Sequence, residues 1–349
     1  MEASVFDRIR VNLLAKRHSL AEWLRRTPAR TRQIRLGPAA EPALRAHLNK
    51  LDSAIAEIEE HTLGRCQVCH EYVDPELLEM DYTASVCLDH FSDDERRLLE
   101  ADLELAQKVQ KALLPQHTPI IPGLELAIFS RPAQIVGGDY FDFFHFADGS
   151  HGLAIADVAG HGMSASLLMA SLQTALRTLV PTTDSPVEVL QHLNRFFVHN
   201  VHFTTFVTLF LACFDHTTQT LTYGNAGHNP PLLYCRQAND GDSINWLQPT
   251  GAAIGLVEEF QITTEMVTLA QGDILLLYTD GVTEAMNTEE DQFGRERLAA
   301  LVHQAAELPA KELVQAVRQE VQAFTDGEAL ADDTTIVVGK ANGGVVGQA

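Results

Sequence analysis

The sequence predicts an α+β protein whose core consists of two β-sheets flanked by helices. From Pro122 onward, short runs rich in β-branched and aromatic residues alternate with turn residues, a pattern typical of strands. Longer segments with helical spacing interrupt these runs in pairs, which favours helices packed on layered sheets. Before residue 122 the chain is helical except for a compact Cys/His segment, so we expect a separate module there.

The first 60 residues are expected to form a basic arm and a helix. Positions 8–35 carry nine basic residues, with Glu22 as the sole acidic one. Residues 1–60 have a net charge of +3 and the other 289 have −25, which gives −22 for the chain. The helix is predicted by apolar residues at steps of three and four, namely Leu44, Leu48, Leu51, Ile55 and Ile58. We interpret the arm as solvated and paired with the acidic remainder, or alternatively as a contact surface for a partner.

Residues 61–92 contain two pairs of metal-ligating side chains. Cys66 and Cys69 form the first pair and Cys87 and His90 the second, each separated by two residues. A tight turn with this spacing aims two side chains at one ion, so the two pairs complete a tetrahedral Zn²⁺ site. Because four protein ligands close the coordination shell, we expect one structural zinc ion.

The stretch from Leu51 to Phe91 resembles the DksA/TraR-type zinc finger. The resemblance rests on the preceding helix, the Gly-Arg-Cys entry to the first pair, and Asp-Pro-Glu-Leu-Leu between the pairs. His90 stands where that family usually has a cysteine. The resemblance implies a zinc-binding module whose relatives contact the transcription machinery.

Residues 93–115 are predicted to form a linker or switch helix. Ser92 with Glu95 three residues later is an N-cap signature, and Pro115 ends the helix after Leu114. Leu98, Leu105 and Ala112 repeat every seven residues beside a second apolar stripe. This helix either packs on its own domain only, or packs there and also pairs with a second copy through residues 93–114 as a homodimer.

The rest of the chain alternates strands and helices. The expected strands are Leu124–Phe129, Tyr140–Phe146, Gly152–Asp157, Thr205–Phe214, Gln219–Tyr223, Leu232–Cys235, Ile262–Leu269, Asp273–Thr279 and Thr334–Val338. The expected helices are Met163–Leu179, Pro186–Asn200, Gly294–Ala306 and Pro309–Phe324. Asn225–Pro231 is interpreted as a structural turn, and residues 341–349 as a flexible tail.

Four acidic signals lie at or near the ends of predicted strands. They are Gly-Gly-Asp139 with Asp142, Ala-Asp157-Val, Thr-Asp280-Gly and the pair Asp332-Asp333. Clustered carboxylates are costly unless something neutralises them, and hardly any Lys or Arg lies nearby in the sequence. Ligation by oxygen alone favours Mg²⁺ or Mn²⁺ over zinc.

Taken in order, these motifs resemble the SpoIIE/RsbU branch of the PPM metal-dependent protein phosphatases. The motifs are VGGDYFDFF, IADVAGHGMSASLLMA, LTYGNAGHNPPLLY, LYTDGVTEAMN with FGRERL, and DDTTIVV, preceded by a helix that ends AQKVQKALLPQ. The resemblance covers about residues 100–340. It implies an αββα sandwich over residues 116–340, with a two-metal site at one edge of the sheets.

The resemblance also implies the roles of individual residues. Asp157 would bridge two Mn²⁺ or Mg²⁺ ions beside the carbonyl of Val158, and Asp139 would serve one of them. Asp280 and Asp332 would serve the other, with Asp333 as the less certain member of its pair. Gly137, Gly138 and Gly281 fit positions of close backbone approach or positive φ.

His161 marks a departure from the eukaryotic-type members, which have a histidine two residues after the bridging aspartate. Here the histidine stands four residues after Asp157, where many members of this branch carry lysine. We therefore assign His161 no catalytic role.

Two hypotheses of function follow. The first is a protein serine/threonine phosphatase in which water activated by two metal ions attacks phosphorus, acting by resemblance on a phosphorylated STAS-domain anti-sigma-factor antagonist in bacterial partner switching. The N-terminal module would regulate it through the 93–115 helix. The alternative is a zinc-finger adapter or transcription-associated regulator whose phosphatase-like domain mainly binds partners.

The composition of the chain indicates in which compartment we expect the protein and which classes of partner we expect it to bind. The acidic body argues against general nucleic-acid binding, although the basic arm weakens this for residues 1–60. No apolar run approaches the ~20 residues needed to span a bilayer. The start MEASVFDRIR lacks the layout of a signal peptide, so we expect a cytoplasmic protein. Five cysteines, an odd number, argue against a disulfide framework there.

Overall fold

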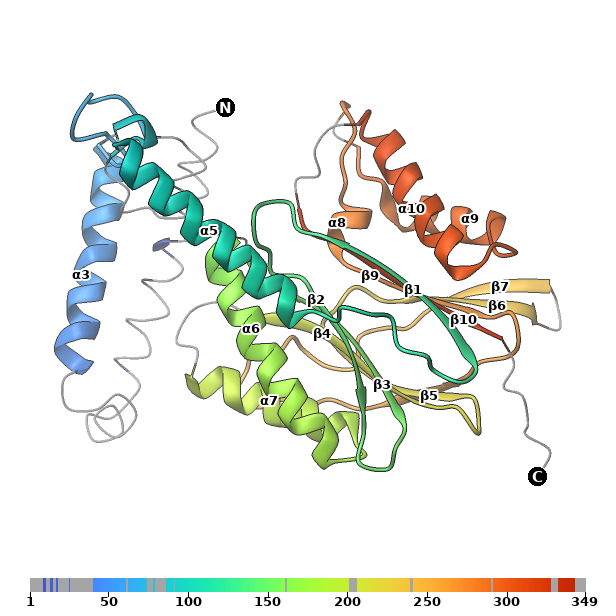
Figure 1. Ribbon diagram of the computed structural model, residues 1–349. Coiled ribbons are helices and arrows are strands. Elements are labelled where there is room, and N and C mark those ends of the chain that lie inside the picture. Colours follow the sequence, from blue (N-terminus) through green and yellow to red (C-terminus); the bar gives the residue numbers. More distant parts are fainter. Residues whose placement is uncertain are drawn as a thin grey trace. The chain divides into compact units, whose positions relative to one another are not determined.

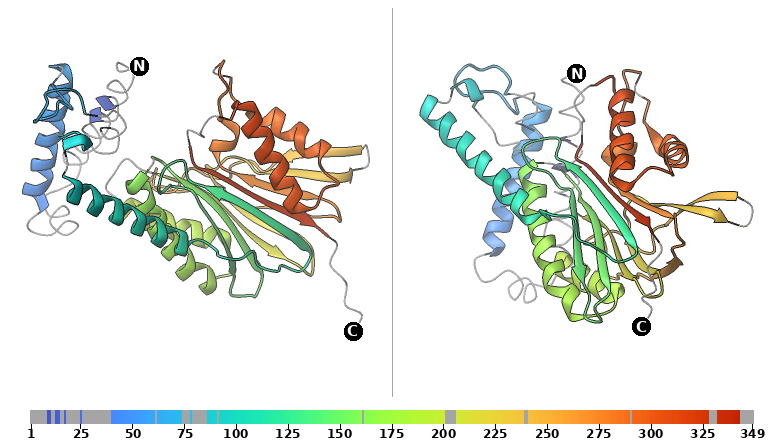
Figure 2. Two further views of the ribbon diagram at one scale, coloured as in Figure 1. Left: turned by 45° about the horizontal axis from the view of Figure 1, so that its top comes forward. Right: turned by 45° about the vertical axis from the view of Figure 1, so that its right-hand side comes forward.

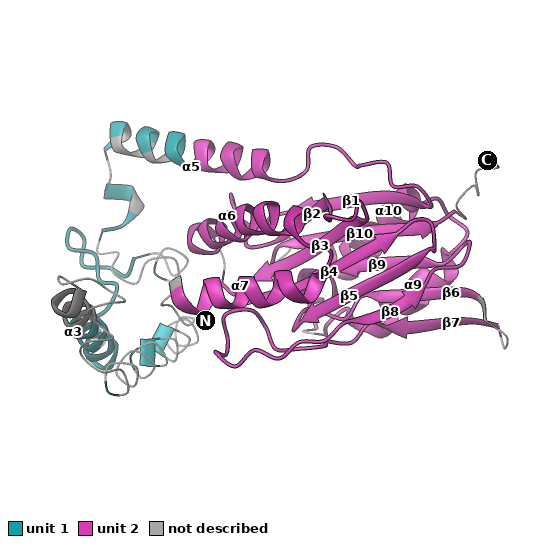
Figure 3. Cartoon of the chain, turned by 90° about the horizontal axis from the view of Figure 1, so that it is seen from below, with its two compact units in different colours: residues 1–102 teal, residues 103–349 magenta. Residues whose placement is uncertain are grey.

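The computed structural model (Figure 1) describes the greater part of the chain. The described residues are 9–10, 13–14, 17, 25, 40–60, 62–73, 78, 86–90, 92–160, 162–200, 206–238, 241–289, 291–327 and 332–342. They belong to two units, Met1–Asp102 and Leu103–Ala349 (Figure 3). Most of the predicted basic arm at 8–35 lies outside the described residues, as do His161 and residues 343–349 of the predicted tail. Among the helices described, none combines the length and apolar character that a membrane span requires.

The first unit is organised around helix α3 (Ala40–Glu59). Its predicted apolar face is confirmed at Leu51, Ile55 and Ile58, which are buried. They pack in one cluster with Leu63, Val73, Leu78 and the thiol-bearing Cys66. The small apolar core therefore adjoins the first of the two Cys/His pairs.

Helix α5 (Asp93–Leu113) begins in the first unit and ends in the second. Its bounds agree with the predicted start after Ser92 and stop before Pro115. The side chain of Leu114 packs against two apolar clusters of the second unit. The end of the helix is thus anchored on the sheets that follow.

Two five-stranded antiparallel sheets form the second unit. One has the order β1-β10-β9-β6-β7, with bounds Leu124–Arg131, Thr334–Ala341, Ile274–Tyr278, Leu232–Ala238 and Gly241–Trp246. The other has the order β2-β3-β4-β5-β8, with bounds Tyr140–His145, His151–Val158, Val207–Asp215, Thr220–Ala226 and Glu265–Thr268. Both sheets, packed face to face, are visible in Figures 1 and 2.

Three apolar layers hold the sheets and helices together. The middle layer joins residues of both sheets, such as Phe210 and Tyr223 from one and Leu277 and Val337 from the other. The outer face of the β2–β8 sheet packs on α6 (Gly162–Leu179) and α7 (Pro186–Asn200). The outer face of the β1–β7 sheet packs on α9 (Gly294–Gln304) and α10 (Ala310–Phe324).

The predicted αββα sandwich is confirmed by this layering. Because both faces of each sheet are covered, strands such as β9 are apolar throughout and not alternating: all of Ile274–Tyr278 is buried. The edge strand β7 and the one-turn helix α8 (Asp280–Thr283) were not predicted, and β8 is shorter than the predicted Ile262–Leu269. Two short 3-10 helices, Leu88–His90 and Val180–Thr182, complete the described elements.

Antiparallel pairing brings the acidic motifs to one edge of the sandwich. The hairpin of β2 and β3 places Tyr140 opposite Ala156, so the start of β2 adjoins the end of β3. In the other sheet Ile336 pairs with Tyr278, so the start of β10 adjoins the end of β9. Asp139, Asp157, Asp280 and Asp333 each lie at one of these strand ends.

Candidate functional site

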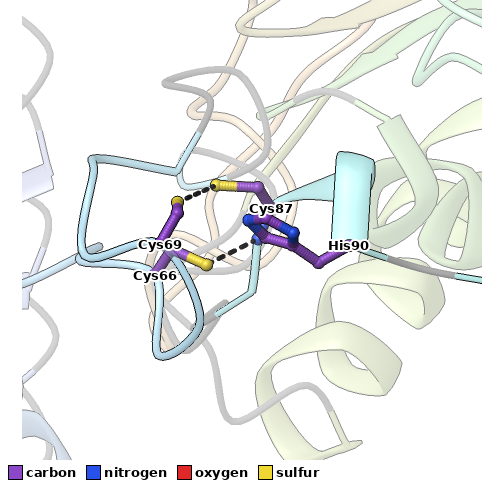
Figure 4. Close-up of side chains that lie close together, drawn as sticks. All are labelled: Cys66, Cys69, Cys87 and His90. Atoms are coloured by element: carbon purple, nitrogen blue, oxygen red, sulfur yellow. Dashed lines mark hydrogen bonds between the residues drawn. The ribbon is translucent and has the colours of Figure 1, made fainter.

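The four predicted zinc ligands converge in the first unit (Figure 4). Ligand atoms of Cys66, Cys69, Cys87 and His90 all lie within 4.8 Å of one another. In the parts of the chain that the structure describes, no other group of three or more such side chains is drawn together so closely. His70, which follows the first pair directly, is not part of the group.

Local turns aim these side chains at one point. The N–H groups of Val68 and Cys87 both donate to Sγ of Cys66, each at 3.4 Å, and Sγ of Cys69 lies 3.8 Å from that of Cys87. His70 closes the first turn with a positive φ of 63°. His90 ends the short 3-10 helix after Cys87, whose carbonyl accepts its N–H at 3.0 Å.

The protonation of the thiols fits a site that takes a cation. Burial and then the neighbouring Cys66 and Cys69 thiols raise the pKa of Cys87 to about 12, because a second negative charge at this point is repelled. Three thiols and an imidazole are the donor set that zinc prefers, and a bound cation would allow the thiols to ionise together. The residues therefore fit the predicted zinc ion.

At the sheet edge of the second unit, Asp139 is buried between the two sheets. Its Oδ2 accepts hydrogen bonds from the hydroxyl of Thr279, the residue after β9, at 2.8 Å and from that of Thr335 on β10 at 2.7 Å. Its Oδ1 is also buried but has no hydrogen-bond partner. Burial first, and then the charge of Asp157, raise the pKa of Asp139 well above its usual value.

Asp157 and Asp280 are both partly buried and are both repelled by neighbouring carboxylates. Burial, followed by repulsion from Asp280, Asp332 and further carboxylates, raises the pKa of Asp157 to about 8. Burial and then repulsion from Asp332 and Glu284 raise the pKa of Asp280 to about 6. Each carboxylate thus makes its neighbours harder to ionise, and a cation bound among them would offset this repulsion.

The two members of the Asp332-Asp333 pair lie in different surroundings. Asp333 is buried, and its carboxylate accepts the N–H of Ala133 at 2.7 Å and the N–H of Gly138 at 2.6 Å. Asp332 is exposed, and its Oδ1 accepts the N–H of Asp333 at 2.8 Å. Asp333 therefore holds the loop before β2, whereas the side chain of Asp332 faces the open edge.

Gly281 permits the close contact between the two loops that carry Asp280 and Asp333. A Cβ atom at this position would lie 2.1 Å from the carbonyl oxygen of Asp333. No side chain fits there without moving the backbone. The predicted close approach at Gly281 is thus confirmed.

Several residues of this edge were missed by sequence reasoning. Glu284 adds a negative charge that acts on Asp157 and Asp280, and Thr279 and Thr335 orient Asp139. Position within the motifs could have indicated them, since Thr279 precedes Asp280 and Thr335 follows the Asp pair by two residues. A threonine in the sequence does not by itself indicate a role at a metal site.

The donor set fits the predicted Mg²⁺ or Mn²⁺ ions. All candidate ligands are oxygens, and one of them, Oδ1 of Asp139, is buried without a partner and so has an open coordination position. The carboxylates are not drawn together within 4.8 Å as the Cys/His ligands are. The acidic edge is accordingly a broader site than the Cys/His cluster, consistent with more than one ion.

Comparison with known proteins agrees with this architecture. Residues 147–342 match the family described as Stage II sporulation protein E (SpoIIE). Phosphoserine phosphatase RsbU of Bacillus subtilis is 31% identical over 240 residues, covering 69% of this chain and 70% of RsbU.

Solved structures share the fold of the second unit. The SiaA-PP2C domain of Pseudomonas aeruginosa has a TM-score of 0.60 at 23% identity, covering 70% of this chain and 98% of that domain. The RsbU and RsbW domains of a Mycobacterium tuberculosis protein have a TM-score of 0.54 at 27% identity, covering 65% of this chain and 62% of that one. The αββα sandwich of this chain is thus a PP2C-like fold.

Proposed function

The chain belongs to the SpoIIE family of PPM-type serine phosphatases, and from this premise we propose that its acidic sheet edge removes phosphate from phosphoserine or phosphothreonine of a partner protein. The observation that carries the proposal is the convergence of Asp139, Asp157, Asp280 and Asp332 from four strand ends. Their mutual repulsion calls for divalent cations, and phosphoryl transfer is the chemistry such cations serve.

Each carboxylate has a distinct part in this proposal. Asp157 would hold both ions, with the carbonyl of Val158 beside it. Asp139 would offer its unpartnered Oδ1 to one ion, and Asp280 and Asp332 would hold the other. Asp333 positions the loop before Asp139 through its two N–H contacts and is not itself a ligand. When bound, Mg²⁺ or Mn²⁺ lowers the pKa of a water molecule and neutralises phosphoryl oxygens, so that phosphorus is attacked directly.

Hydrolysis of a phosphoserine peptide tests this proposal. With Mn²⁺, the full chain should release phosphate, and EDTA should abolish the release. Asp157→Asn should lower the rate on the order of 10³-fold, because metal coordination contributes several kcal/mol to the transition state. Asp184→Asn, at an exposed position after α6, is the matched control and should match wild type. Equal Mn²⁺-dependent rates for wild type and Asp157→Asn would contradict the proposal.

The substrate in the cell is a phosphorylated STAS-domain anti-sigma-factor antagonist, by analogy with RsbU. The support is the similarity to RsbU, which extends over 240 residues of this chain. A phosphorylated STAS domain should be hydrolysed with at least a tenfold higher kcat/KM than a peptide that carries its phosphoserine. Equal kcat/KM values for the two substrates would argue for another protein partner.

The exposed apolar stripe of α5 supports the proposal of a homodimer through residues 93–114. Leu98, Leu105 and Val109 are 66%, 59% and 52% exposed and lie on one helix face at steps of seven and four. A second copy of the helix would cover this stripe. Leu105→Gln should shift the mass measured by sedimentation from dimer toward monomer, whereas the neighbouring Glu104→Gln should not. A monomeric wild type would rule out this pairing.

The Cys/His cluster holds one structural zinc ion in a cytoplasmic protein. Reduced cysteines are typical of that compartment, and the described cysteines are all free. The alternative of an adapter whose second unit mainly binds partners gains no support, because all four aspartates are present, with Asp139 buried and Asp157 and Asp280 under mutual carboxylate repulsion.

A further inference from the structure

Three histidines stand side by side at the end of the sandwich that lies opposite the acidic edge. His145 is the last residue of β2 and His151 the first of β3, and the two are paired directly across the hairpin. His216 follows β4 directly, in the turn that leads to β5. We call these three side chains the histidine row. β3 runs from His151 toward Asp157 and a strand rises about 3.3 Å per residue, so the row lies about 20 Å from the acidic edge.

The rings of the histidine row are in contact with one another. The ring centroids of His145 and His151 lie 4.9 Å apart, and those of His151 and His216 lie 5.5 Å apart. His145 and His216 are exposed, whereas His151 between them is half-buried. Exposed side chains change rotamer readily, so the two outer rings can turn about the inner one. Three imidazoles that come from three neighbouring strands of one sheet thus form a single group.

The alternation of side chains along the strands explains where the histidine row lies. Side chains on one face of a strand recur at every second residue. Phe143, Leu153 and Phe214 all pack in the inter-sheet core, and each member of the row stands two residues further out on the same face. The row is therefore the rim of the inner face of this sheet. The core holds the base of the row, while its outer rings reach water and dissolved ions.

Two aspartates fix the turns beside the histidine row. In the turn of the β2–β3 hairpin, Oδ1 of Asp148 accepts the N–H of Ser150 at 2.9 Å. In the turn that carries His216, Oδ1 of Asp215 accepts the N–H of Thr217 at 2.8 Å. The two turns are neighbours, since the charge of Asp215 acts on Asp148. Both turns are thus held in place, and their two negative charges favour a cation beside the imidazoles.

The distances between the rings suit a metal ion after small rotations. Two ring nitrogens bound to one tetrahedral ion lie about 3.3 Å apart, because each metal–nitrogen bond is about 2.0–2.1 Å long. The nitrogens of the histidine row are not gathered within 4.8 Å of one another as the Cys/His ligands are. Rings that already touch can bring them together by turning about their side-chain bonds. Burial, and then the neighbouring His145 and His216, lower the pKa of His151, so this ring is neutral and has a lone pair to offer at neutral pH.

We propose that the histidine row binds one transition-metal ion of the class of Zn²⁺ or Ni²⁺, at a site separate from the Cys/His cluster and from the acidic edge. Imidazole is a ligand that zinc, copper and nickel share, whereas Mg²⁺ prefers oxygen. The bound ion joins β2, β3 and the end of β4, which are neighbours in one sheet. This inference goes beyond the proposed function and does not depend on phosphatase activity.

Calorimetric titration of the full chain with Ni²⁺ tests the proposal. The protein is first given one equivalent of Zn²⁺, which thiolates prefer, and is kept in excess Mg²⁺, which carboxylates prefer, so that the other two candidate sites are occupied. Wild type should bind one Ni²⁺ per chain. His151→Asn and His216→Asn should each weaken this binding by at least about tenfold, because each removes one of three imidazole ligands. His192→Asn, at an exposed position of α7, is the control and should bind Ni²⁺ as wild type does.

Amide hydrogen exchange in the hairpin turn locates the bound ion. The N–H of Phe146 donates to the carbonyl oxygen of Ser150, and the N–H of Gly149 donates to that of Phe146, both at 3.0 Å. An ion that joins the two strands of the hairpin restrains this turn. At the Ni²⁺ concentration that half-saturates wild type, both amides should exchange more slowly in wild type and His192→Asn than in the two variants of the histidine row.

Three results would overturn the inference. The first is a wild type that binds no Ni²⁺ under these conditions, and the second is equal Ni²⁺ affinity in wild type and in both variants of the histidine row. The third is a loss of affinity in His151→Asn that His216→Asn does not share, because the site then does not need three imidazoles. Circular dichroism establishes that each variant is folded, and the exposed His145→Asn replaces His151→Asn if the latter does not fold.

Discussion

The two candidate metal sites are assembled in different ways. The Cys/His ligands come from the short stretch between Cys66 and His90, and their atoms already lie within 4.8 Å of one another. The aspartates come from strand ends between Asp139 and Asp332 and stand further apart. One site depends on two local turns beside a small apolar cluster, and the other on a two-sheet core.

This difference indicates what each metal does for the protein. In the first unit the apolar cluster is small, so we expect that zinc, if it binds at the Cys/His cluster, would contribute to folding itself. In the second unit the threonine, glycine and carboxylate contacts hold the aspartates through the fold alone. We therefore expect metal removal to unfold the first unit and to leave the second folded but inactive.

The largest expected effect is on the first unit. Cys69→Ser, or a strong chelator, should remove the zinc ion, and residues 62–73 should then exchange their amide hydrogens as an unfolded segment does. Structural zinc binding is worth about 10–16 kcal/mol in small fingers, so no partial effect is expected. Elemental analysis and hydrogen exchange measure this, with β9 and β10 as internal references.

Cys235→Ser serves as the control for the zinc prediction. Cys235 is a half-buried cysteine of β6 that packs on the inter-sheet core and lies outside the Cys/His group. This variant should retain one zinc ion per chain and wild-type exchange at 62–73. Retention of zinc by Cys69→Ser would show that the site does not need all four side chains.

The next prediction distinguishes the roles of the neighbouring residues Asp332 and Asp333, one in activity and the other in stability. Asp332→Asn should lower Mn²⁺-dependent hydrolysis on the order of a hundredfold with an unchanged free energy of unfolding, because its carboxylate faces the open edge. Asp333→Asn should instead lower the free energy of unfolding by about 1–3 kcal/mol, because a buried acceptor of two N–H groups is lost. Each variant is the control for the other, and a reversal of the two results would exchange the roles.

A third prediction concerns a second aspartate of the same motif, Asp142, which is 1% exposed and lies three residues after Asp139. Its carboxylate accepts two hydrogen bonds from the Arg177 guanidinium, at 2.7 and 2.6 Å, and one from the Tyr140 hydroxyl at 2.6 Å. Arg177→Met leaves this buried charge without its cation and should lower the free energy of unfolding by about 3 kcal/mol.

Denaturant unfolding measures the effect of Arg177→Met. Arg195→Met, at an exposed position of α7, should change stability by less than about 0.5 kcal/mol. The metal affinity of the Arg177 variant should stay near that of wild type, because Asp142 is part of the frame and not of the site. An Arg177 variant as stable as the Arg195 variant would mean that the buried carboxylate is neutral.

The sequence was sufficient for most of the strands and for the positions of the candidate aspartates near strand ends, because apolar runs and acidic strand ends are local patterns. It predicted both layers of helices and placed Asp157 and Asp280 at strand ends, where the structure has them. Strand β7 was missed because Gly241–Trp246 contains few apolar residues and lies at a sheet edge.

What the sequence could not indicate depends on contacts between distant residues. Nothing local distinguishes Gln110 from the exposed Gln107, or Asp142 from Asp139 three residues earlier. The amide of Gln110 pairs with the backbone of Gly137, and Asp142 pairs with Arg177. Asp139 accepts from the hydroxyls of Thr279, directly after β9, and of Thr335 on β10. Such pairings follow from the topology and not from spacing along the chain.

The smallest effect comes from the turn that was interpreted as structural. Asn225 and Ala226 belong to β5, so the turn begins later than predicted. The N–H of His228 donates to Oδ1 of Asn225 at 2.8 Å, and the imidazole is buried with Nδ1 2.8 Å from Oγ1 of Thr208. Thr208 pairs with Asp157, so this histidine lies behind the aspartate site. Burial lowers the pKa of His228 to about 4.

The sign of the resulting pH dependence follows from proton uptake. The unfolded chain binds a proton at His228 below about pH 6.5, whereas the folded chain does not until about pH 4, so the folded state loses stability as the pH falls between these values. At pH 5 this one group should cost about 2 kcal/mol relative to pH 8. Denaturant unfolding at both pH values should therefore show that the free energy of unfolding of wild type falls from pH 8 to pH 5. In His228→Asn this fall should be smaller by about 2 kcal/mol. His192→Asn, at an exposed position, is the control, and its free energy of unfolding should fall as much as that of wild type. If the free energy of unfolding fell equally in all three proteins, His228 would take up its proton within the fold.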